Sequence, residues 1–132
     1  MDDKQMVPIK PIQLVQQRAF ERSAAFIEAN IGSALLFKRK LHLHNHVASL
    51  VPEEGLCIEC GVFKGRSINH MAKLLSNRTL YGFDSFEGLS ENWSGNYHQQ
   101  GHFDQQGSLP EVEGNVELIK GWVDDTFAPF LE

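Results

Sequence analysis

The 132-residue sequence has 12 Lys and Arg against 17 Asp and Glu, a net charge of −5, and a hydrophobic fraction of 42%. This length fits one folded domain with a sizeable core. The mild acidity argues against partners that need a basic face, such as nucleic acids and anionic membranes, and no apolar run approaches the roughly 20 residues that span a bilayer. The N-terminus has no signal-peptide pattern, so we expect a soluble cytoplasmic protein.

Residues 1–54 are predicted to form an N-terminal helical segment. Apolar residues recur at helical spacing from residue 12 to residue 31, and Gly32 ends that helix. A second helix is predicted from its N-cap at Ser33 to about Leu50. This helix contains three histidines, His42, His44 and His46. Only the first and third share a helical face, which favours solvated histidines over a metal site.

Residues 55–132 are predicted to form an α/β unit. The expected elements are a strand at 56–60, a glycine-bounded turn at 61–65, a helix at 66–75, a strand at 79–84, a loop at 85–114, a strand at 116–120 and a helix at 122–131. This order implies a Rossmann-like parallel sheet with right-handed crossovers.

Two cysteines have the C-x-x-C spacing of redox motifs. A redox dithiol needs its first cysteine at a helix N-terminus, whereas Cys57 and Cys60 both fall in the first predicted strand. Residues three apart on a strand point to opposite faces, which favours ordinary buried thiols over a redox or metal site.

An acid stands at the end of each of the first two predicted strands, Glu59 and Asp84. In open α/β sheets, ligands bind beyond the carboxyl ends of the strands. Asp84 follows Gly65 by 19 residues, about the separation at which an acid meets the ribose diol in dinucleotide sites. The turn lacks the middle glycine that a pyrophosphate requires, and Glu59 would attract an ammonium group rather than a phosphate. A ribose, an ammonium group and a carboxylate in one ligand describe S-adenosylmethionine.

Three segments follow one another at workable separations: ECGVFKGRS at 59–67, GFDSFEGL at 82–89 and KGWVDDT at 120–126. The first resembles the first motif of class I methyltransferases. The other two resemble segments of the macrocin O-methyltransferase (TylF-like) family. The resemblance implies methyl transfer from S-adenosylmethionine to a hydroxyl of a small molecule or sugar.

The resemblance also implies a cofactor site. The methionine end of the cofactor would be framed by Glu59, Gly61, Val62 and Gly65, with Ser67 at its carboxylate. The ribose hydroxyls would be held by Asp84, with Ser85 and Phe86 beside the ribose and adenine. The adenine would be bordered by Gly121 and Trp122, and its amino group would donate to Asp125 rather than to Asp124. Packing in the core is the other interpretation for the two aromatic residues.

The complete family sheet has further strands on the other side of the first one. Those strands carry the acidic metal-binding residues and the base, and this chain ends at Glu132. We therefore expect the N-terminal half of a catalytic domain, with a divalent metal only when the other half is present. The first strand would then be an open edge, which favours a homo-oligomer or another edge-paired association. The long loop resembles a lid or acceptor-facing segment, and solvated histidines are favoured over a base at His98 or His102.

Two other functions are consistent with this pattern of residues. One is a nicotinamide-nucleotide-binding fold, against which the missing middle glycine argues. The other is a non-catalytic remnant that binds a ligand or partner without turnover.

Overall fold

The computed structural model of the chain describes residues 10–95 and 97–132. The chain divides into two compact units, Met1–Leu36 and Phe37–Glu132. The division falls inside the 1–54 region that the sequence groups as one helical segment. Within the described ranges, no helix has both the length and the apolar character needed to cross a bilayer.

The helix of the first unit is α1 (Pro11–Asn30), which confirms the helix predicted there. Proline at the first helical position has no N–H to leave unpaired. The backbone N–H of Lys10 donates to Oε1 of Gln13 at 2.9 Å, and the N–H of Ile31 donates to the carbonyl of Ile27 at 2.9 Å. One backbone N–H next to each end of the helix is therefore paired locally.

The second helix, α2 (Lys40–Ala48), does not begin at the predicted cap Ser33. The backbone is extended at Arg39, with φ −134° and ψ 139°. The ring of Phe37 lies 5.3 Å from the ring of His46. In one continuous helix, residues nine apart would be separated by about 13 Å along the axis. The chain thus folds back to bring these rings together, and the helix starts only after that bend.

α2 packs on α3 (Arg66–Leu74), which follows the first strand. The rings of His44 and His70 lie 5.9 Å apart, and Nε2 of His70 is 2.9 Å from Oδ1 of Asn45. One of the three α2 histidines therefore belongs to a helix–helix contact rather than to solvent.

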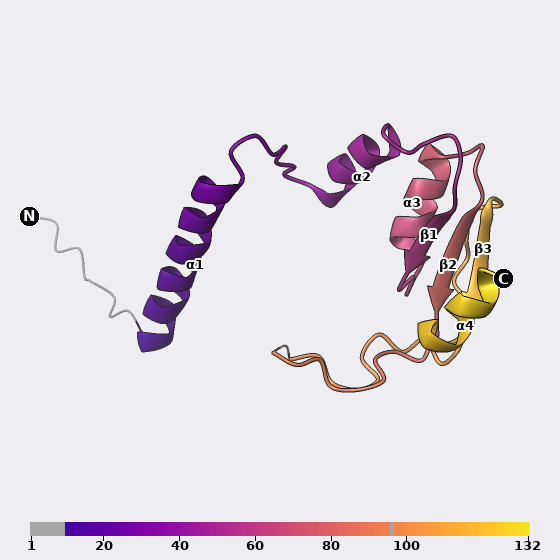
Figure 1. Cartoon of the computed structure of the whole chain (residues 1–132). Helices are drawn as coiled ribbons and strands as arrows, with labels where there is room; N and C mark the ends of the chain where they lie inside the picture. Colours follow the sequence, from indigo (N-terminus) through magenta and orange to yellow (C-terminus); the bar gives the residue numbers. More distant parts are fainter. Residues whose placement is uncertain (1–9, 96) are drawn as a thin grey trace, which may run out of the picture. The chain divides into compact units, whose positions relative to one another are not determined.

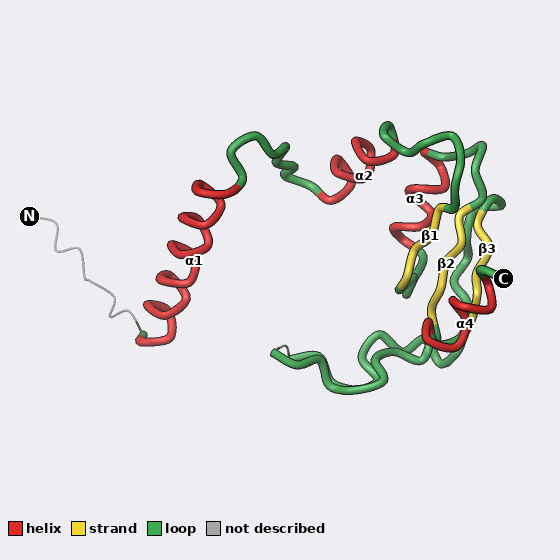
Figure 2. The backbone as a smooth tube through the Cα atoms, in the orientation of Figure 1, coloured by secondary structure: helices red, strands yellow, loops and turns green. Residues whose placement is uncertain are grey.

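The sheet has three parallel strands in the order β1 (Cys57–Cys60), β2 (Leu80–Asp84) and β3 (Val116–Lys120) (Figures 1 and 2). The last helix, α4 (Val123–Phe130), follows β3 directly. This arrangement confirms the predicted α/β, Rossmann-like fold class. The three carboxyl ends share one edge of the sheet because all three strands run the same way.

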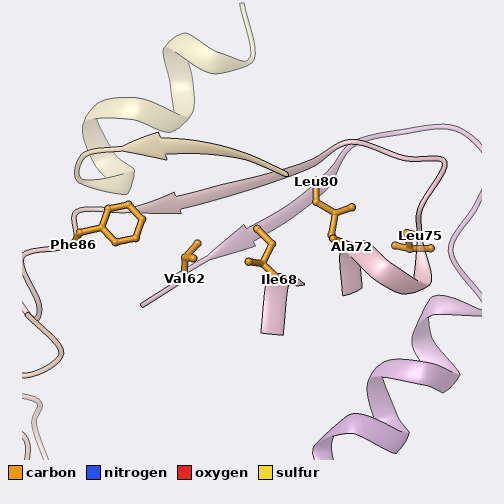
Figure 3. Packing of buried hydrophobic residues seen from close by; sticks show 6 residues of the cluster. All are labelled: Val62, Ile68, Ala72, Leu75, Leu80 and Phe86. Carbon is orange, nitrogen blue, oxygen red and sulfur yellow. The ribbon is translucent and has the colours of Figure 1, made fainter. Parts of the chain in front are cut away.

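α3 and α4 lie on opposite sides of the strands (Figure 3). On the α3 side, the buried core is formed by Val62, Ile68, Ala72, Leu75, Leu80 and Phe86. On the other side, the ring of Phe83 lies 5.4 Å from that of Phe127 and 5.2 Å from that of Phe130. β2 is thus covered on both faces, as a central parallel strand requires.

Gly82 sets how closely α3 approaches the sheet. A Cβ atom at this position would lie 2.7 Å from Cδ1 of Ile68 and 2.8 Å from Cγ2 of Val62. Only glycine leaves room for both side chains. The glycine therefore brings the turn after β1 and the first turn of α3 down onto β2.

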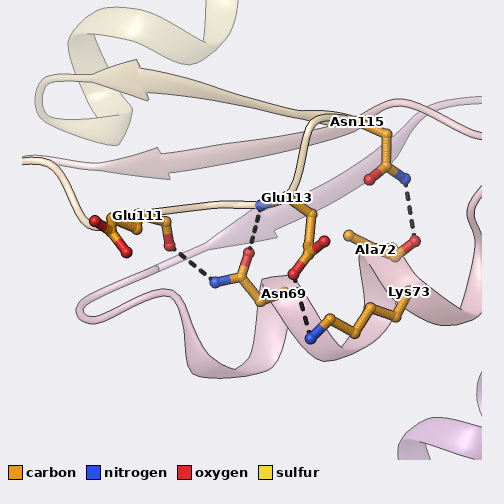
Figure 4. A network of polar contacts seen from close by, with 6 residues as sticks. All are labelled: Asn69, Ala72, Lys73, Glu111, Glu113 and Asn115. Atoms are coloured by element: carbon orange, nitrogen blue, oxygen red, sulfur yellow. Dashed lines mark hydrogen bonds and ion pairs between the residues drawn. The ribbon is translucent and has the colours of Figure 1, made fainter.

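Polar side chains tie α3 to the segment that leads into β3 (Figure 4). Asn69 donates to the carbonyl of Glu111 and accepts from the N–H of Glu113, each at 2.9 Å. Nδ2 of Asn115 is within hydrogen-bond distance of the carbonyls of Ala72 (3.1 Å), Leu75 (3.2 Å) and Arg78 (2.9 Å). These bonds fix where β3 begins.

β1 is less covered than predicted. Cys57 is half-buried, whereas Ile58 is 36% exposed and Cys60 is exposed. The expectation of two buried thiols is therefore wrong for Cys60. The physical reason is that β1 pairs with β2 on one side only. No strand of the described residues lies along its other edge.

Candidate functional site

The turn between β1 and α3 forms the centre of the candidate site. Gly61 and Gly65 both adopt the left-handed region, with φ of 86° and 73°. Gly65 is the N-cap of α3, and its N–H donates to the carbonyl of Val62 at 3.0 Å. Phe63, between the two glycines, also has a positive φ of 52°. This conformation is an outlier for an aromatic residue and must be held by its surroundings.

Asp84, at the carboxyl end of β2, holds this turn. Its Oδ2 accepts the backbone N–H groups of Val62 at 2.8 Å and Phe63 at 2.7 Å. Its Oδ1 accepts the N–H of Phe86, at 2.8 Å. Phe86 has a φ of 58°, so the one carboxylate supports two phenylalanines in left-handed conformations. A carboxylate has about four acceptor positions, and three of them are used by backbone.

Glu59 approaches the same turn from β1. Its Oε1 accepts the hydroxyl of Ser67, in the first turn of α3, at 2.7 Å. Glu59 also borders a cavity of about 300 Å³ that is lined by residues of β1 together with Met71, Leu75 and Leu80. Asp84 is not among the residues that line this cavity. Asp84 therefore bonds to the turn itself, whereas Glu59 bonds to the first turn of the helix that follows it.

The two residues after Asp84 are buried and pack in the fold rather than lining an open site. Phe86 is 1% exposed and lies in the core with Val62, as the packing interpretation predicts (Figure 3). Ser85 is 7% exposed, and its hydroxyl accepts the N–H of Glu87 at 3.2 Å. In this structure neither side chain presents an open surface to a ribose or an adenine.

The end of β3 is more open. The N–H of Gly121 donates to the carbonyl of Asp84 at 3.0 Å, which places the third predicted segment beside the end of β2. Trp122 is 39% exposed, so the core-packing interpretation does not hold for this ring. Asp124 and Asp125 are both exposed in the first turn of α4, where the helix dipole favours acids. Their positions do not distinguish between them as adenine partners.

The loop predicted at 85–114 contains local structure that the sequence analysis missed. Its two arms run side by side (Figures 1 and 2), with an antiparallel bridge between Glu87 and Asp104. The N–H of Leu89 donates to the carbonyl of His102, and the N–H of Gly101 donates to that of Leu89, both at 2.9 Å. We call residues 86–95 and 97–107 the loop hairpin. Regularly spaced glycines, at 88, 95, 101 and 107, are the signal that could have predicted it.

Aromatic rings connect the loop hairpin to the turn. Phe103 and Phe63 make an edge-to-face contact with ring centroids 5.3 Å apart. The rings of His98 and His102 lie 4.0 Å apart, and that of His102 is 4.2 Å from Phe103. Sequence analysis missed Phe63 and Phe103. The described ranges contain no group of three or more His, Cys, Asp or Glu that could hold a metal ion.

The chain matches no protein-family model and no curated protein sequence. Among solved structures, it is similar to the calicheamicin methyltransferase CalS11, with a TM-score of 0.51 and 21% sequence identity. The match covers 99% of this chain and 66% of CalS11, so the chain spans just under two thirds of that protein's length. This likeness shows a Rossmann-like fold similar to that of CalS11.

Proposed function

We propose that this chain binds S-adenosylmethionine as part of a methyltransferase that acts on a hydroxyl of a small molecule or sugar. One observation carries the proposal. In a methyltransferase-like fold, the acid that ends β2 is bonded to the glycine turn that follows β1. The macrocin O-methyltransferase family remains the specific family that the sequence motifs suggest.

The chemistry of the turn favours S-adenosylmethionine over a dinucleotide. A pyrophosphate needs backbone that it can approach closely, and this turn carries Phe63 with its ring packed on Phe103. Glu59, just before this turn, would repel phosphates. Oε2 of Glu59 makes no hydrogen bond to the described residues, and its negative charge suits the ammonium group of a methionine moiety.

The same residues fit the rest of the cofactor. Oδ1 of Asp84 accepts one N–H from the described residues, which leaves one acceptor position for a ribose hydroxyl. The exposed ring of Trp122 offers a face to adenine, and the exposed carboxylate of Asp125 can accept from an adenine amino group. We propose these roles together with the frame formed by Gly61, Val62 and Gly65.

When bound, the cofactor supplies an electrophilic methyl group on its sulfonium. The residues of this chain hold the cofactor and fix its orientation, which lowers the entropic cost of the transfer. The proton of the acceptor hydroxyl must pass to a base, and we assign that role to none of the described residues. The proposal assigns no divalent metal to the described residues.

Calorimetric titration with S-adenosylhomocysteine and with NAD tests the proposal. We expect heat with the first ligand alone. The substitution Glu59→Gln keeps an oxygen for the Ser67 hydroxyl but removes the charge, so we expect roughly tenfold weaker binding of S-adenosylhomocysteine. The matched control is Glu54→Gln, an exposed acid in the lead-in to the same strand.

Each other outcome has a defined meaning. Heat with NAD alone would support a nicotinamide-nucleotide-binding protein instead. No heat with either ligand would support a non-catalytic remnant. Equal binding by the Glu59 variant and the Glu54 control would remove the ammonium contact from the proposal.

A further inference from the structure

The hydrogen bonds at Asp84 limit how it can take a ribose. Each carboxylate oxygen has about two acceptor positions. Oδ2 already accepts two backbone N–H groups, those of Val62 and Phe63, whereas Oδ1 accepts only that of Phe86. Oδ2 is therefore full, and Oδ1 has one position left.

A vicinal diol that binds both oxygens of the carboxylate needs one position on each. Oδ1 can provide it at once. Oδ2 can provide it only by releasing the N–H of Val62 or of Phe63. Bidentate binding of a ribose therefore changes the turn between β1 and α3, whereas binding through a single hydroxyl leaves the turn as it is.

Phe63 carries this change toward the loop hairpin. Its left-handed conformation depends on the bond to Oδ2, because an aromatic residue rarely adopts a φ of 52° unsupported. Its ring lies against Phe103, which belongs to the returning arm of the loop hairpin and itself has a φ of 72°. A shift of Phe63 therefore alters the surface on which Phe103 rests.

A second connection stays intact in this scheme. The carbonyl of Phe86 accepts the N–H groups of Gln105 at 3.1 Å and Gly107 at 2.9 Å. These bonds close the base of the loop hairpin. Oδ1 of Asp84 also accepts the N–H of Phe86, which holds that residue in place. The base therefore remains fixed while the contact between Phe63 and Phe103 changes.

We propose that Asp84 is a positioning residue that couples binding of a ribose diol to the position of the loop hairpin. The inference rests on the proposed function, since it takes the ribose to be that of S-adenosylmethionine. The diol displaces a turn N–H from Oδ2, and the change passes through Phe63 to Phe103. Cofactor binding then changes the position of the loop hairpin, the segment that we expect to face the acceptor.

The test follows backbone amides by ¹⁵N NMR and hydrogen exchange. S-adenosylhomocysteine should raise the exchange rate of the Val62 or Phe63 amide about tenfold and shift the signals of the Leu89 and Gly101 amides in the loop hairpin. The 2′-deoxy analogue of S-adenosylhomocysteine lacks the diol. It should bind more weakly and leave all four amides unchanged.

Two variants test the route. In Phe103→Ala, S-adenosylhomocysteine should still change the turn amides but should no longer shift those of the loop hairpin. The control Leu109→Ala, which shortens an exposed apolar side chain of the same predicted loop, should respond as the unaltered protein does. A loop response that persists in Phe103→Ala, or an equal response to both ligands, would overturn the proposed coupling.

Failure of the cofactor assignment gives a different pattern. If neither ligand binds, the proposed function is wrong. The contact between the turn and the loop hairpin can then still be tested in the ligand-free protein. There, Phe103→Ala should raise the exchange rate of the Phe63 amide about fivefold relative to Leu109→Ala. An unchanged rate would overturn the link as well.

Discussion

β1 and β2 are neighbouring parallel strands, yet they are covered very differently. Leu80 and Phe83 of β2 are 5% and 0% exposed, whereas Ile58 of β1 is 36% exposed and Cys60 is exposed. β2 has a strand on each side and helices on both faces, whereas β1 pairs with one strand among the described residues. The difference teaches that burial of an apolar strand is decided by its neighbours rather than by its own composition.

The largest effect should come from the covered strand. Phe83→Ala removes a fully buried ring that contacts two aromatic rings of α4. We expect the free energy of unfolding to fall by about 3–5 kcal/mol, measured by denaturant titration. A loss below about 1 kcal/mol would show that α4 does not cover β2 in solution.

Gly82→Ala tests the close approach of α3 to the same strand. The added Cβ would meet the ends of Ile68 and Val62 side chains at less than 3 Å. Overpacking of this kind costs about 1–3 kcal/mol, and the measurement is again denaturant unfolding. The control is Gly114→Ala, where a Cβ meets nothing within 4 Å. Equal stability of the two variants would contradict the packing described for Gly82.

Asn115→Ala tests the connection between α3 and the start of β3. The side-chain amide lies within hydrogen-bond distance of three backbone carbonyls, two of them at the end of α3 or just after it. We expect a loss of about 1–3 kcal/mol, because the variant leaves these acceptors unpaired. Unchanged hydrogen exchange in β3 would argue against this role.

The smallest effect on stability should come from the open strand. Ile58→Ala should cost less than about 1 kcal/mol, since much of this side chain is already in water. We propose that β1 supports association through its unpaired edge, so Ile58→Lys should shift sedimentation toward the monomer. If the unaltered chain is a monodisperse monomer, the proposed association is wrong. The predicted small loss of stability in Ile58→Ala would not be affected.

The sequence predicted the strands well because their signals are local. Each predicted strand overlaps the observed one, since short apolar runs between glycine and polar punctuation specify them. The predicted start of α2 was wrong because the contact between Phe37 and His46 is a tertiary contact, which the periodicity of apolar residues does not indicate. A helical pattern alone cannot show where a chain bends back.

The candidate site was predicted in part. Asp84 bonds to the glycine turn and Glu59 bonds to the helix after it, near the edge where parallel strands bring their carboxyl ends together. The use of Asp84 by three backbone N–H groups could not be predicted, since it depends on left-handed conformations at Phe63 and Phe86. Sequence patterns favour glycine for such conformations and give no signal when phenylalanine adopts them.

The exposed thiol at the end of β1 offers a chemical reporter of what happens at that strand. Cys60 is exposed, whereas Cys57, the other cysteine, is half-buried. A maleimide dye should therefore label position 60 first while the strand remains uncovered. Any molecule that comes to lie over that end of β1 would slow the labelling, so the reaction rate reads out occupancy without an engineered tag.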